Sequence, residues 1–359
     1  MLIFANPDHA AHCGRFEMFR GRQVPCHEVP ARLDQVLAEL ERRRFCAPGG
    51  PAALREPLPL ERALLERVHA PRYLDFLENA WGEWLALDPA NAALDALPSV
   101  WPVRGFRSDI APQNFAARMG LFSFDSGSPL TAGTWRAAWQ GAACAASAAQ
   151  ALLGGPTEDR PTATLALTRP PGHHAGPDFF GGYCFINNAA VAAEALLAQG
   201  ARRVAILDVD YHHGNGTQTI FEARADILTV SLHGDPRTEY PFYLGHADER
   251  GTGAGEGFNL NLPLPAGTGF DAWRRALHSG LQRVSDHGAD AVIVALGVDT
   301  FAGDPISRFG LASQDYLTLG ADLAGLGLPL LFTLEGGYAV ADMGVNVVNV
   351  LEGVMIAVA

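Results

Sequence analysis

The strongest constraint on this sequence is an alternation of short apolar runs and Ala- and Leu-rich runs between residues 160 and 340. The short runs are rich in Val, Ile, Leu and Ala, which is typical of strands that are buried on both faces. They cover residues 162–168, 203–209, 227–232, 291–297 and 328–337, and helices are expected at residues 187–200 and 270–284. Buried strands separated by helices indicate an α/β fold with a parallel sheet covered on both sides.

The first part of the chain is less regular. Residues 31–45, 60–80 and 135–153 have helical patterns, whereas residues 87–135 are rich in Pro, Gly, Asn and Ser and show poor periodicity. A long irregular segment in a compact protein usually forms a functional surface or an interface. No shift in composition marks a second domain, so we expect residues 1–359 to form a single domain.

Polar residues gather where four of the predicted strands end. The four segments are RPPGHHA (169–175), DVDYHHGNG (208–216), LGVD (296–299) and EGGY (335–338). Binding sites in open parallel sheets form just outside the carboxyl ends of the strands. The sequence therefore predicts that these four segments contribute to one site.

The second and third segments have the composition of a metal site. Asp208, Asp210 and His212 alternate along the chain, so an extended backbone would direct all three to one side. Asp210 and His212 could then bind one metal ion, with Asp299 as a third ligand from a neighbouring strand. Three protein ligands leave positions open for water and substrate, which is the arrangement of a catalytic metal.

Each of these residues also has an ordinary explanation when it is taken alone. An aspartate at a strand end, such as Asp299, is more often a helix cap. A tyrosine after Gly-Gly, such as Tyr338, is commonly a turn residue. The tandem His173-His174 beside Pro170 and Pro171 is harder to explain in this way. The joint occurrence of all four segments favours a functional site.

Composition excludes several classes of function. The net charge of −13 disfavours a nucleic-acid partner, and the absence of Lys rules out Schiff-base catalysis. The chain has five Cys, which is an odd number, and no CxxC motif. This pattern fits a protein of a reducing compartment better than a disulfide framework. We see neither a signal peptide nor an apolar run of membrane-spanning length, so no membrane partner is expected. The cytoplasm is the expected location.

Longer blocks of the sequence resemble a known family. RPPGHHA, GGYCFINNAA, DVDYHHGNGTQ, SLHGDP, LGVDTFAGDP and EGGY are similar to the signature blocks of the histone deacetylase superfamily and occur in the same order. VHAPRYLDFL (68–77) resembles its N-terminal block, and DPISRF (304–309) and GVNVVNVLEG (344–353) resemble the acetylpolyamine amidohydrolase branch. The resemblance implies a three-layer, open α/β fold with a mainly parallel eight-stranded sheet, shared with arginases.

The resemblance also implies a role for each residue that matches a family motif. Asp210, His212 and Asp299 would be the metal ligands. Zinc is the expected ion, although Fe²⁺, Co²⁺ and Mn²⁺ also suit two carboxylates and an imidazole. The expected catalytic residues are His174 as general base and acid, His173 as its electrostatic partner, and Tyr338 as the donor to the oxyanion.

Residues around the expected metal site have supporting roles in the family. Asp208 is expected to orient His173, and Asn215 to orient His174, where several family members have Asp instead. A structural K⁺ site is implied by the positions that match the family's monovalent-cation site, namely Asp208, Asp210, His212, Ser231 and Leu232. Phe180, Tyr183, His233 and Asp125 are expected to line the substrate tunnel.

The resemblance gives residues 87–135 the role of an insertion that narrows the tunnel and builds a homodimer. Relatives carry acidic residues on this insertion that attract the distal ammonium of a polyamine. This chain has Ala116 and Gly127 at those positions, with Asp109 and Asp125 nearby as substitutes.

The predicted activity is therefore hydrolysis of small acetylated amines, such as N-acetylputrescine and N-acetylcadaverine. The alternatives within the class are a protein acetyl-lysine deacetylase and a hydrolase of another small acylamide. Outside it are an arginase-like ureohydrolase, which would need ligands for two manganese ions, and a catalytically silent amine-binding protein.

Overall fold

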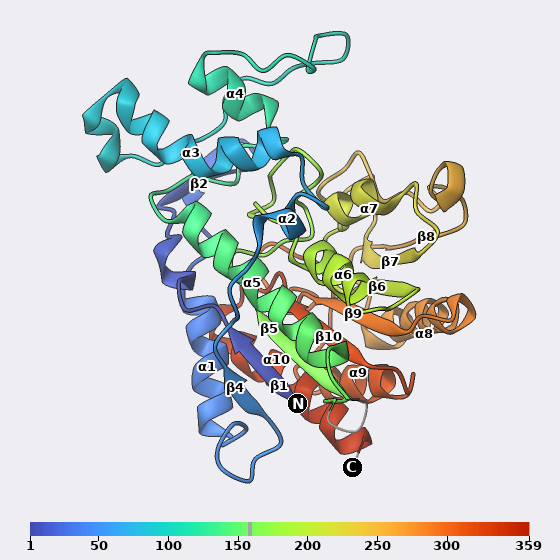
Figure 1. Ribbon diagram of the computed structural model, residues 1–359. Helices are drawn as coiled ribbons and strands as arrows, with labels where there is room; N and C mark the ends of the chain where they lie inside the picture. Colours follow the sequence, from blue (N-terminus) through green and yellow to red (C-terminus); the bar gives the residue numbers. More distant parts are fainter. Residues whose placement is uncertain (157–159, 359) are drawn as a thin grey trace.

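The computed structural model describes residues 1–156 and 160–358 and is built around one eight-stranded sheet (Figure 1). The strand order is β4-β1-β5-β10-β9-β6-β7-β8, and every neighbouring pair is parallel. The strands are β1 (Leu2–Ala5), β4 (Ala53–Arg55), β5 (Ala163–Leu167), β6 (Val204–Asp208), β7 (Ile227–Gly234), β8 (Asn259–Leu264), β9 (Ala291–Leu296) and β10 (Leu330–Leu334). The predicted α/β fold is confirmed, with a sheet that is parallel throughout.

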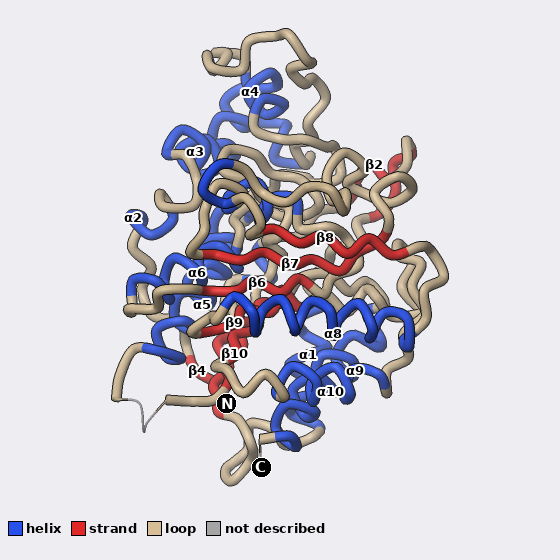
Figure 2. The backbone as a smooth tube through the Cα atoms, turned by 90° about the vertical axis from the view of Figure 1, so that its right-hand side faces the viewer, coloured by secondary structure: helices blue, strands red, loops and turns tan. Residues whose placement is uncertain are grey.

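Helices cover both faces of the sheet, as Figure 2 shows from the side. One layer consists of α1 (Ala31–Arg42), α8 (Phe270–His287), α9 (Asp315–Ala324) and α10 (Val340–Ala357). The other contains α5 (Thr134–Leu153) and α6 (Asn188–Ala198), with α2 (Arg62–Leu65) and α7 (Asn215–Phe221) beside α6. Two further helices, α3 (Pro71–Leu87) and α4 (Phe115–Leu121), lie at the end of the molecule away from the two termini (Figure 1).

The strands place alternate side chains in two separate cores. In β6, Val204 and Ile206 pack beneath α5 and α6, whereas Ala205 and Leu207 pack against the other helical layer. Successive side chains of a strand point to opposite faces, so a strand in the middle of this sheet needs apolar residues at every position. This requirement explains the continuous apolar runs in the sequence.

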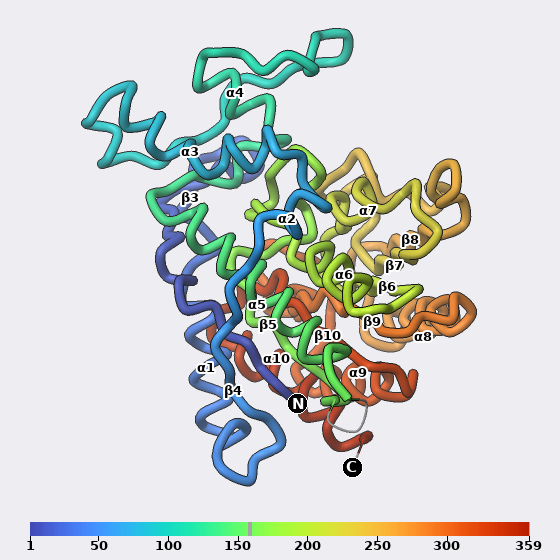
Figure 3. The backbone as a smooth tube through the Cα atoms, viewed as in Figure 1, coloured from blue at the N-terminus to red at the C-terminus, as the bar shows by residue number. Residues whose placement is uncertain are grey.

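Three strands of the sheet and a hairpin were not predicted from the sequence. The missed strands are β1, β4 and β8, and the hairpin pairs β2 (Phe16–Phe19) with β3 (Arg22–Pro25). Figure 3 shows the chain leaving β1, forming this hairpin and returning through α1 to β4 at the edge of the sheet. With four and three residues, β1 and β4 are too short for periodicity to separate a strand from a loop. β8 (NLNLPL) is an edge strand that alternates Asn with Leu and so lacks a continuous apolar run.

The expectation that residues 87–135 lack regular structure is wrong for part of the segment. It contains the 3₁₀ helix Pro89–Ala93 and the helix α4. The side chain of Asn114 accepts a hydrogen bond from the backbone N–H of Ala117 and so caps α4, which buries Phe115 and Met119. With seven residues, α4 is too short to give a clear helical period.

The last helix, α10, is long and apolar enough to cross a membrane by length and composition, which corrects the expectation that no apolar run reaches that length. Its apolar residues serve another purpose here, because α10 packs between α1 and α9. Val347, Val350 and Leu351 are fully buried in this contact. The hydropathy of α10 is therefore accounted for by its place in the core.

Candidate metal centre and catalytic site

The four polar segments identified in the sequence follow four adjacent strands of the sheet. In chain order these strands are β5, β6, β9 and β10, but in the sheet they lie side by side in the order β5-β10-β9-β6. Because all four strands are parallel, their carboxyl ends lie at one edge of the sheet. The segments that carry His173, Asp210, Asp299 and Tyr338 therefore meet at a single place.

Asp210, His212 and Asp299 form a buried cluster at this edge. Each offers one ligand atom, and these atoms all lie within 4.8 Å of one another. The Nδ1 atom of His212 lies 2.9 Å from Oδ2 of Asp299 and 3.3 Å from Oδ1 of Asp210. Neither carboxylate has any solvent exposure. The structure thus brings together the three residues that the sequence analysis selected as metal ligands.

The backbone holds these residues by turns rather than by the extended conformation that was expected over residues 208–212. β6 ends at Asp208, and the N–H of Asp210 donates to Oδ1 of Asp208 at 3.1 Å. The N–H of His212 then donates to Oδ1 of Asp210 at 2.8 Å, and that of Tyr211 donates to Oδ1 of Asp299 at 2.8 Å. These three carboxylates therefore fix the backbone of Asp210, Tyr211 and His212.

The donor set fits a divalent cation. Burial raises the pKa of Asp299 to about 8, and repulsion from Asp210 adds to this shift. Two buried carboxylates at this separation are unfavourable unless a positive charge lies between them. Two carboxylates and one imidazole suit Zn²⁺ and other divalent transition metals. The site therefore has the composition and the electrostatic imbalance of a metal centre.

Two glycines make room for the cluster. A Cβ atom on Gly336 would lie 2.6 Å from Oδ2 of Asp210 and 2.7 Å from Oδ2 of Asp299. A Cβ atom on Gly297 would lie 2.1 Å from Oδ2 of Asp210. The backbone N–H of Gly336 also donates to Oδ2 of Asp210 at 2.7 Å. The glycines in the LGVD and EGGY segments are thus required by the close approach of backbone and ligand.

The paired histidines lie next to this cluster, and each is held through its Nδ1 atom. Nδ1 of His173 lies 2.9 Å from Oδ2 of Asp208, and Nδ1 of His174 lies 2.6 Å from Oδ1 of Asn215. Since Asn215 Oδ1 can only accept, the Nδ1–H of His174 must donate, which leaves its Nε2 with a free lone pair. Both orienting partners agree with the residues selected from the sequence.

The two histidines have opposite electrostatic environments. Burial lowers the pKa of His173, but the carboxylates of Asp210 and Asp208 more than compensate and raise it to about 10. Burial, together with the neighbouring His173 and His212, lowers the pKa of His174 well below 6.5. His174 is therefore neutral and able to accept a proton, while the environment of His173 favours its cationic form.

Tyr338 is the only member of the EGGY segment that lines the adjoining cavity. Its backbone N–H donates to Oδ2 of Asp304 at 2.7 Å, and its ring meets that of Tyr183 at a centroid distance of 5.4 Å. The guanidinium of Arg32 lies 4.8 Å from the centroid of the same ring. Burial raises the pKa of Tyr338 well above 10, so its hydroxyl stays protonated and can donate a hydrogen bond.

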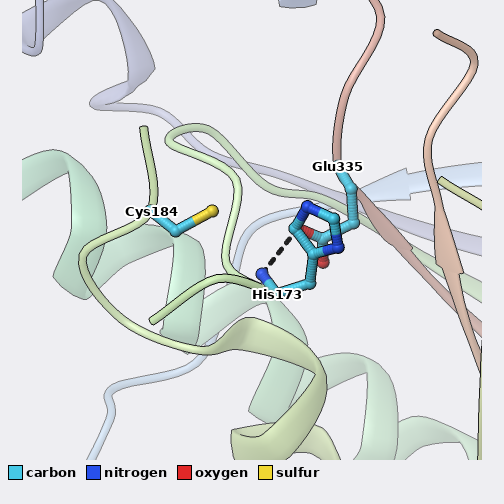
Figure 4. Close-up of side chains that lie close together, drawn as sticks. All are labelled: His173, Cys184 and Glu335. Carbon is cyan, nitrogen blue, oxygen red and sulfur yellow. Dashed lines mark hydrogen bonds between the residues drawn. The ribbon is translucent and has the colours of Figure 1, made fainter. Parts of the chain in front are cut away.

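His173, Cys184 and Glu335 form a second buried group (Figure 4). Glu335 already has protein partners, since its Oε2 accepts from the N–H groups of Gly172 at 2.6 Å and His173 at 3.1 Å. Burial raises the pKa of Cys184 well above 9, so it is a neutral thiol rather than a thiolate ligand. This group supports the loop that carries His173.

A cavity of about 340 Å³ leads from the protein surface to the catalytic residues. Residues from eight stretches of the chain line it: Met18, Phe19, Arg20, Phe124, Asp125, Ser126, Gly127, His174, Gly182, Tyr183, His212, Glu239, Tyr240, Pro241, Phe242, Tyr243, Ile306 and Tyr338. Seven of these residues are Phe or Tyr, and aromatic side chains are common in small-molecule sites. Of the four residues predicted to line a tunnel, Tyr183 and Asp125 do so.

The placement of Phe180 and His233 in the tunnel is a wrong prediction. Phe180 is fully buried and stacks on Phe185, behind the cavity wall. His233 is also fully buried, and its ring nitrogens bond to Ser231 and to the carbonyl of Gly245. A sequence motif does not reveal which of its residues face a cavity and which face the core.

The acidic residues of the insertion are not free to bind a ligand. Asp125 accepts hydrogen bonds from the N–H groups of Gly127 at 3.0 Å and Gly182 at 2.8 Å, and from the hydroxyl of Tyr240 at 2.6 Å. Asp109 is exposed, forms an ion pair with Arg107 and does not line the cavity. Asp125 therefore has a structural role, because it connects the segments that form the cavity walls.

Two of the residues expected to bind a monovalent cation, Asp208 and Ser231, lie on neighbouring strands. Asp208 and Ser231 are direct partners in the β6–β7 pairing and line one small void of about 10 Å³. The side chain of Leu232 lies in the hydrophobic core, so that only its backbone carbonyl is available. The side chains of Asp210 and His212 belong to the metal cluster.

Several lining residues were missed in the sequence analysis. They come from the β2–β3 hairpin (Met18, Phe19 and Arg20) and from the loop after β7 (Tyr240, Phe242 and Tyr243). The aromatic run YPFY at residues 240–243 was a detectable signal, since consecutive aromatics in a loop are rarely all buried. The hairpin gave no such signal.

Comparison with known proteins agrees with this geometry. A family model described as the histone deacetylase domain matches residues 26–354. Acetylpolyamine amidohydrolase 2 of Pseudomonas aeruginosa is 48% identical to this chain over 98% of both proteins. The acetylpolyamine amidohydrolase of Mycoplana ramosa is 44% identical over 99% of both. A crystal structure of the acetylpolyamine aminohydrolase from Burkholderia pseudomallei superposes with a TM-score of 0.90, at 37% identity over 98% of both chains.

Proposed function

The chain belongs to the histone deacetylase family, and from this premise we propose that it hydrolyses the acetyl amide of small acetylated amines, acetylpolyamines in particular. One observation carries the proposal: the ligand cluster, the paired histidines and Tyr338 meet at one edge of the sheet, beside an aromatic cavity. The relatives matched over their full length, which are named acetylpolyamine amidohydrolases, support this substrate class.

In this proposal Asp210, His212 and Asp299 hold a divalent ion, and zinc is the ion we favour for this ligand set. Fe²⁺, Co²⁺ and Mn²⁺ are compatible with the same donors. When bound, such an ion polarises the amide carbonyl and lowers the pKa of the attacking water.

The protein's own residues would move the protons. His174, which is neutral and has a free Nε2, accepts a proton from the water that attacks the amide carbon. The same nitrogen then returns that proton to the departing amine. His173 is held by Asp208, and its positive charge stabilises the negative charge that develops on the substrate.

Tyr338 would stabilise the oxyanion. Its hydroxyl is protonated, and the ring is fixed between Tyr183 and Arg32. A donor that is already oriented requires little reorganisation when charge develops on the carbonyl oxygen. The remaining walls of the cavity exclude water and surround the acyl group and the aliphatic part of the amine.

We infer that the insertion selects small substrates. Phe124, Asp125, Ser126 and Gly127 of this segment form one wall of the cavity, in contact with the loop that carries Tyr240. The hydrogen bond from the hydroxyl of Tyr240 to Asp125 holds these two segments together. A slender acetylated amine suits such a cavity better than the tail of a folded protein.

A rate comparison tests the proposed function. We expect the zinc-loaded protein to show a higher kcat/KM for N-acetylputrescine, N-acetylcadaverine and N8-acetylspermidine than for an acetyl-lysine peptide. Preference for the peptide would replace this proposal by a protein lysine deacetylase. If protein with stoichiometric metal cleaved none of them, the activity would belong to another acylamide, or the protein would be an amine-binding protein.

We further propose that the chain forms a homodimer through residues 87–135. The part of this segment around residues 94–110 exposes five large apolar side chains, namely Leu94, Val100, Val103, Phe106 and Ile110. Exposed apolar side chains gathered in one segment are typical of protein–protein contacts. Analytical ultracentrifugation should give a dimer at micromolar concentration, and Val103→Asp/Phe106→Asp should shift it to monomer. A wild-type monomer would contradict this assignment.

The cellular setting follows from the same proposal. All five cysteines are unpaired, which suits the reducing cytoplasm, where we place the protein. A structural K⁺ beside Asp208 and Ser231 would add a positive charge to this carboxylate-rich part of the fold.

A further inference from the structure

The outer rim of the cavity carries one charge that the proposed reaction does not use. Arg20, in the turn between β2 and β3, is exposed to solvent and lines the cavity together with Met18 and Phe19. Its guanidinium lies over the ring of Phe19, 5.1 Å from the centroid. This contact is typical of a cation–π interaction and keeps the charge close to the cavity wall.

The hairpin that presents Arg20 is firmly attached to the site. Glu17 in β2 is buried, and its Oε1 accepts from the hydroxyl of Tyr183 at 2.8 Å and lies 2.7 Å from Nδ1 of His27. The backbone N–H of Met18 donates to the carbonyl of Ser126, in the wall formed by residues 124–127, at 3.2 Å. The position of Arg20 is therefore coupled to residues that themselves line the cavity.

The acidic residues of the cavity do not offset this charge. Both carboxylate oxygens of Asp125 accept hydrogen bonds from residues of the cavity walls. Glu239 is buried, and its Oε1 lies 3.5 Å from the guanidinium of Arg308. Within residues 1–156 and 160–358, no carboxylate lies within ion-pairing distance of Arg20 itself. Arg20 is thus the unpaired charge at the rim.

We propose that Arg20 is a specificity-determining residue that lowers the reactivity of an acetylated amine with a distal ammonium at the rim, relative to amides of equal length whose far end is neutral or anionic. This inference rests on the proposed function, since it concerns the far end of the substrate whose acetyl group is removed. A guanidinium repels an ammonium and forms paired hydrogen bonds with a carboxylate. The overall acidity of the protein acts at longer range and does not remove this local repulsion.

Three amides with the same four-methylene chain isolate the effect: N-acetylputrescine, N-pentylacetamide and 5-acetamidopentanoate. Arg20→Gln should raise kcat/KM for N-acetylputrescine relative to N-pentylacetamide by about three- to tenfold, as expected for one partly solvated unit charge. It should lower the relative value for 5-acetamidopentanoate by a similar factor, and Arg20→Glu should enlarge both changes. High salt should reduce all of these differences.

Arg22→Gln is the matched control, because Arg22 lies on the same exposed hairpin but does not line the cavity. It should leave all three relative rates unchanged. If the wild type and both Arg20 variants cleave the three amides in the same ratios, the role assigned to Arg20 is wrong although the enzyme is a deacetylase. If none of the amides is cleaved by any form, the proposed function itself fails.

Discussion

Asp299→Ala should release the metal and abolish activity while the protein stays folded. Asp299 supplies one of three ligand atoms within 4.8 Å, and its loss leaves only Asp210 and His212. Loss of a residue that merely orients a ligand costs about 10- to 100-fold in metal affinity, so loss of a ligand should cost more than about 100-fold. The metal contributes several kcal/mol to catalysis, which corresponds to a fall in kcat/KM of about 1,000-fold or more.

The measurement is metal content per chain by mass spectrometry after desalting, together with kcat/KM and circular dichroism. Asp299→Asn is a second variant that keeps an oxygen for the N–H of Tyr211, now 2.8 Å from Oδ1 of Asp299. Asp322→Ala is the control, because Asp322 forms an ion pair with Arg274 at 2.7 Å between α9 and α8 and is not a member of the metal cluster. Full metal content in Asp299→Ala would refute the assignment of this ligand.

Without metal, the wild type should be no more stable than Asp299→Asn, although it is the more active protein when metal is bound. Burial raises the pKa of Asp299 to about 8, so near neutral pH folding of the metal-free wild type requires this carboxyl to be largely protonated beside Asp210, which costs free energy. Asp299→Asn removes this cost, and its metal-free form should melt no lower than the metal-free wild type. Zinc should raise the melting temperature of the wild type only, because only the wild type retains the full site.

Tyr338→Phe should reduce kcat by about 100- to 1,000-fold, the usual cost of losing one oxyanion donor. The substitution keeps the aromatic ring, whose centroid lies 5.4 Å from that of Tyr183 and 4.8 Å from the guanidinium of Arg32. The shape of the cavity should therefore be preserved. Metal content should stay at the wild-type value and KM should change little, because the hydroxyl acts mainly in the transition state.

Steady-state kinetics with a free acetylated amine, combined with metal analysis, tests this expectation. Tyr243→Phe is the matched control, since Tyr243 lines the same cavity but has a side chain that is 91% exposed. An unchanged kcat in Tyr338→Phe would show that another group stabilises the oxyanion. A parallel loss of metal would mean that Tyr338 supports the ligand loop instead.

The sequence by itself determined the class of fold and the residues that carry the chemistry. The apolar runs that became β5, β6, β7, β9 and β10 were found within a few residues of their observed ends. Such runs are a local signal, because a strand buried on both faces needs apolar side chains at successive positions. The polar residues at their ends were equally visible, since polar groups so close to a core usually have a function.

Only the tertiary structure decided how these residues are arranged. The strands β5, β6, β9 and β10 have similar apolar compositions, so nothing local indicates that they lie in the order β5-β10-β9-β6. That order brings His173, Asp210, Asp299 and Tyr338 together from chain positions that are more than 160 residues apart at the extremes. The turns that orient Asp210 and His212 likewise depend on Asp299, which lies almost 90 residues further along the chain.

The lining of the cavity shows the same limit. His233 belongs to a recognisable motif and Phe180 directly precedes one, yet both are fully buried, whereas Arg20 belongs to no motif and lies on the rim. A periodic pattern reports which side of its own strand or helix a residue occupies. The direction of a loop residue is set instead by contacts with distant segments, such as those of Glu17 with Tyr183 and of Asp125 with Tyr240. These contacts exist only once the chain has folded, and they determine which side chains meet the substrate.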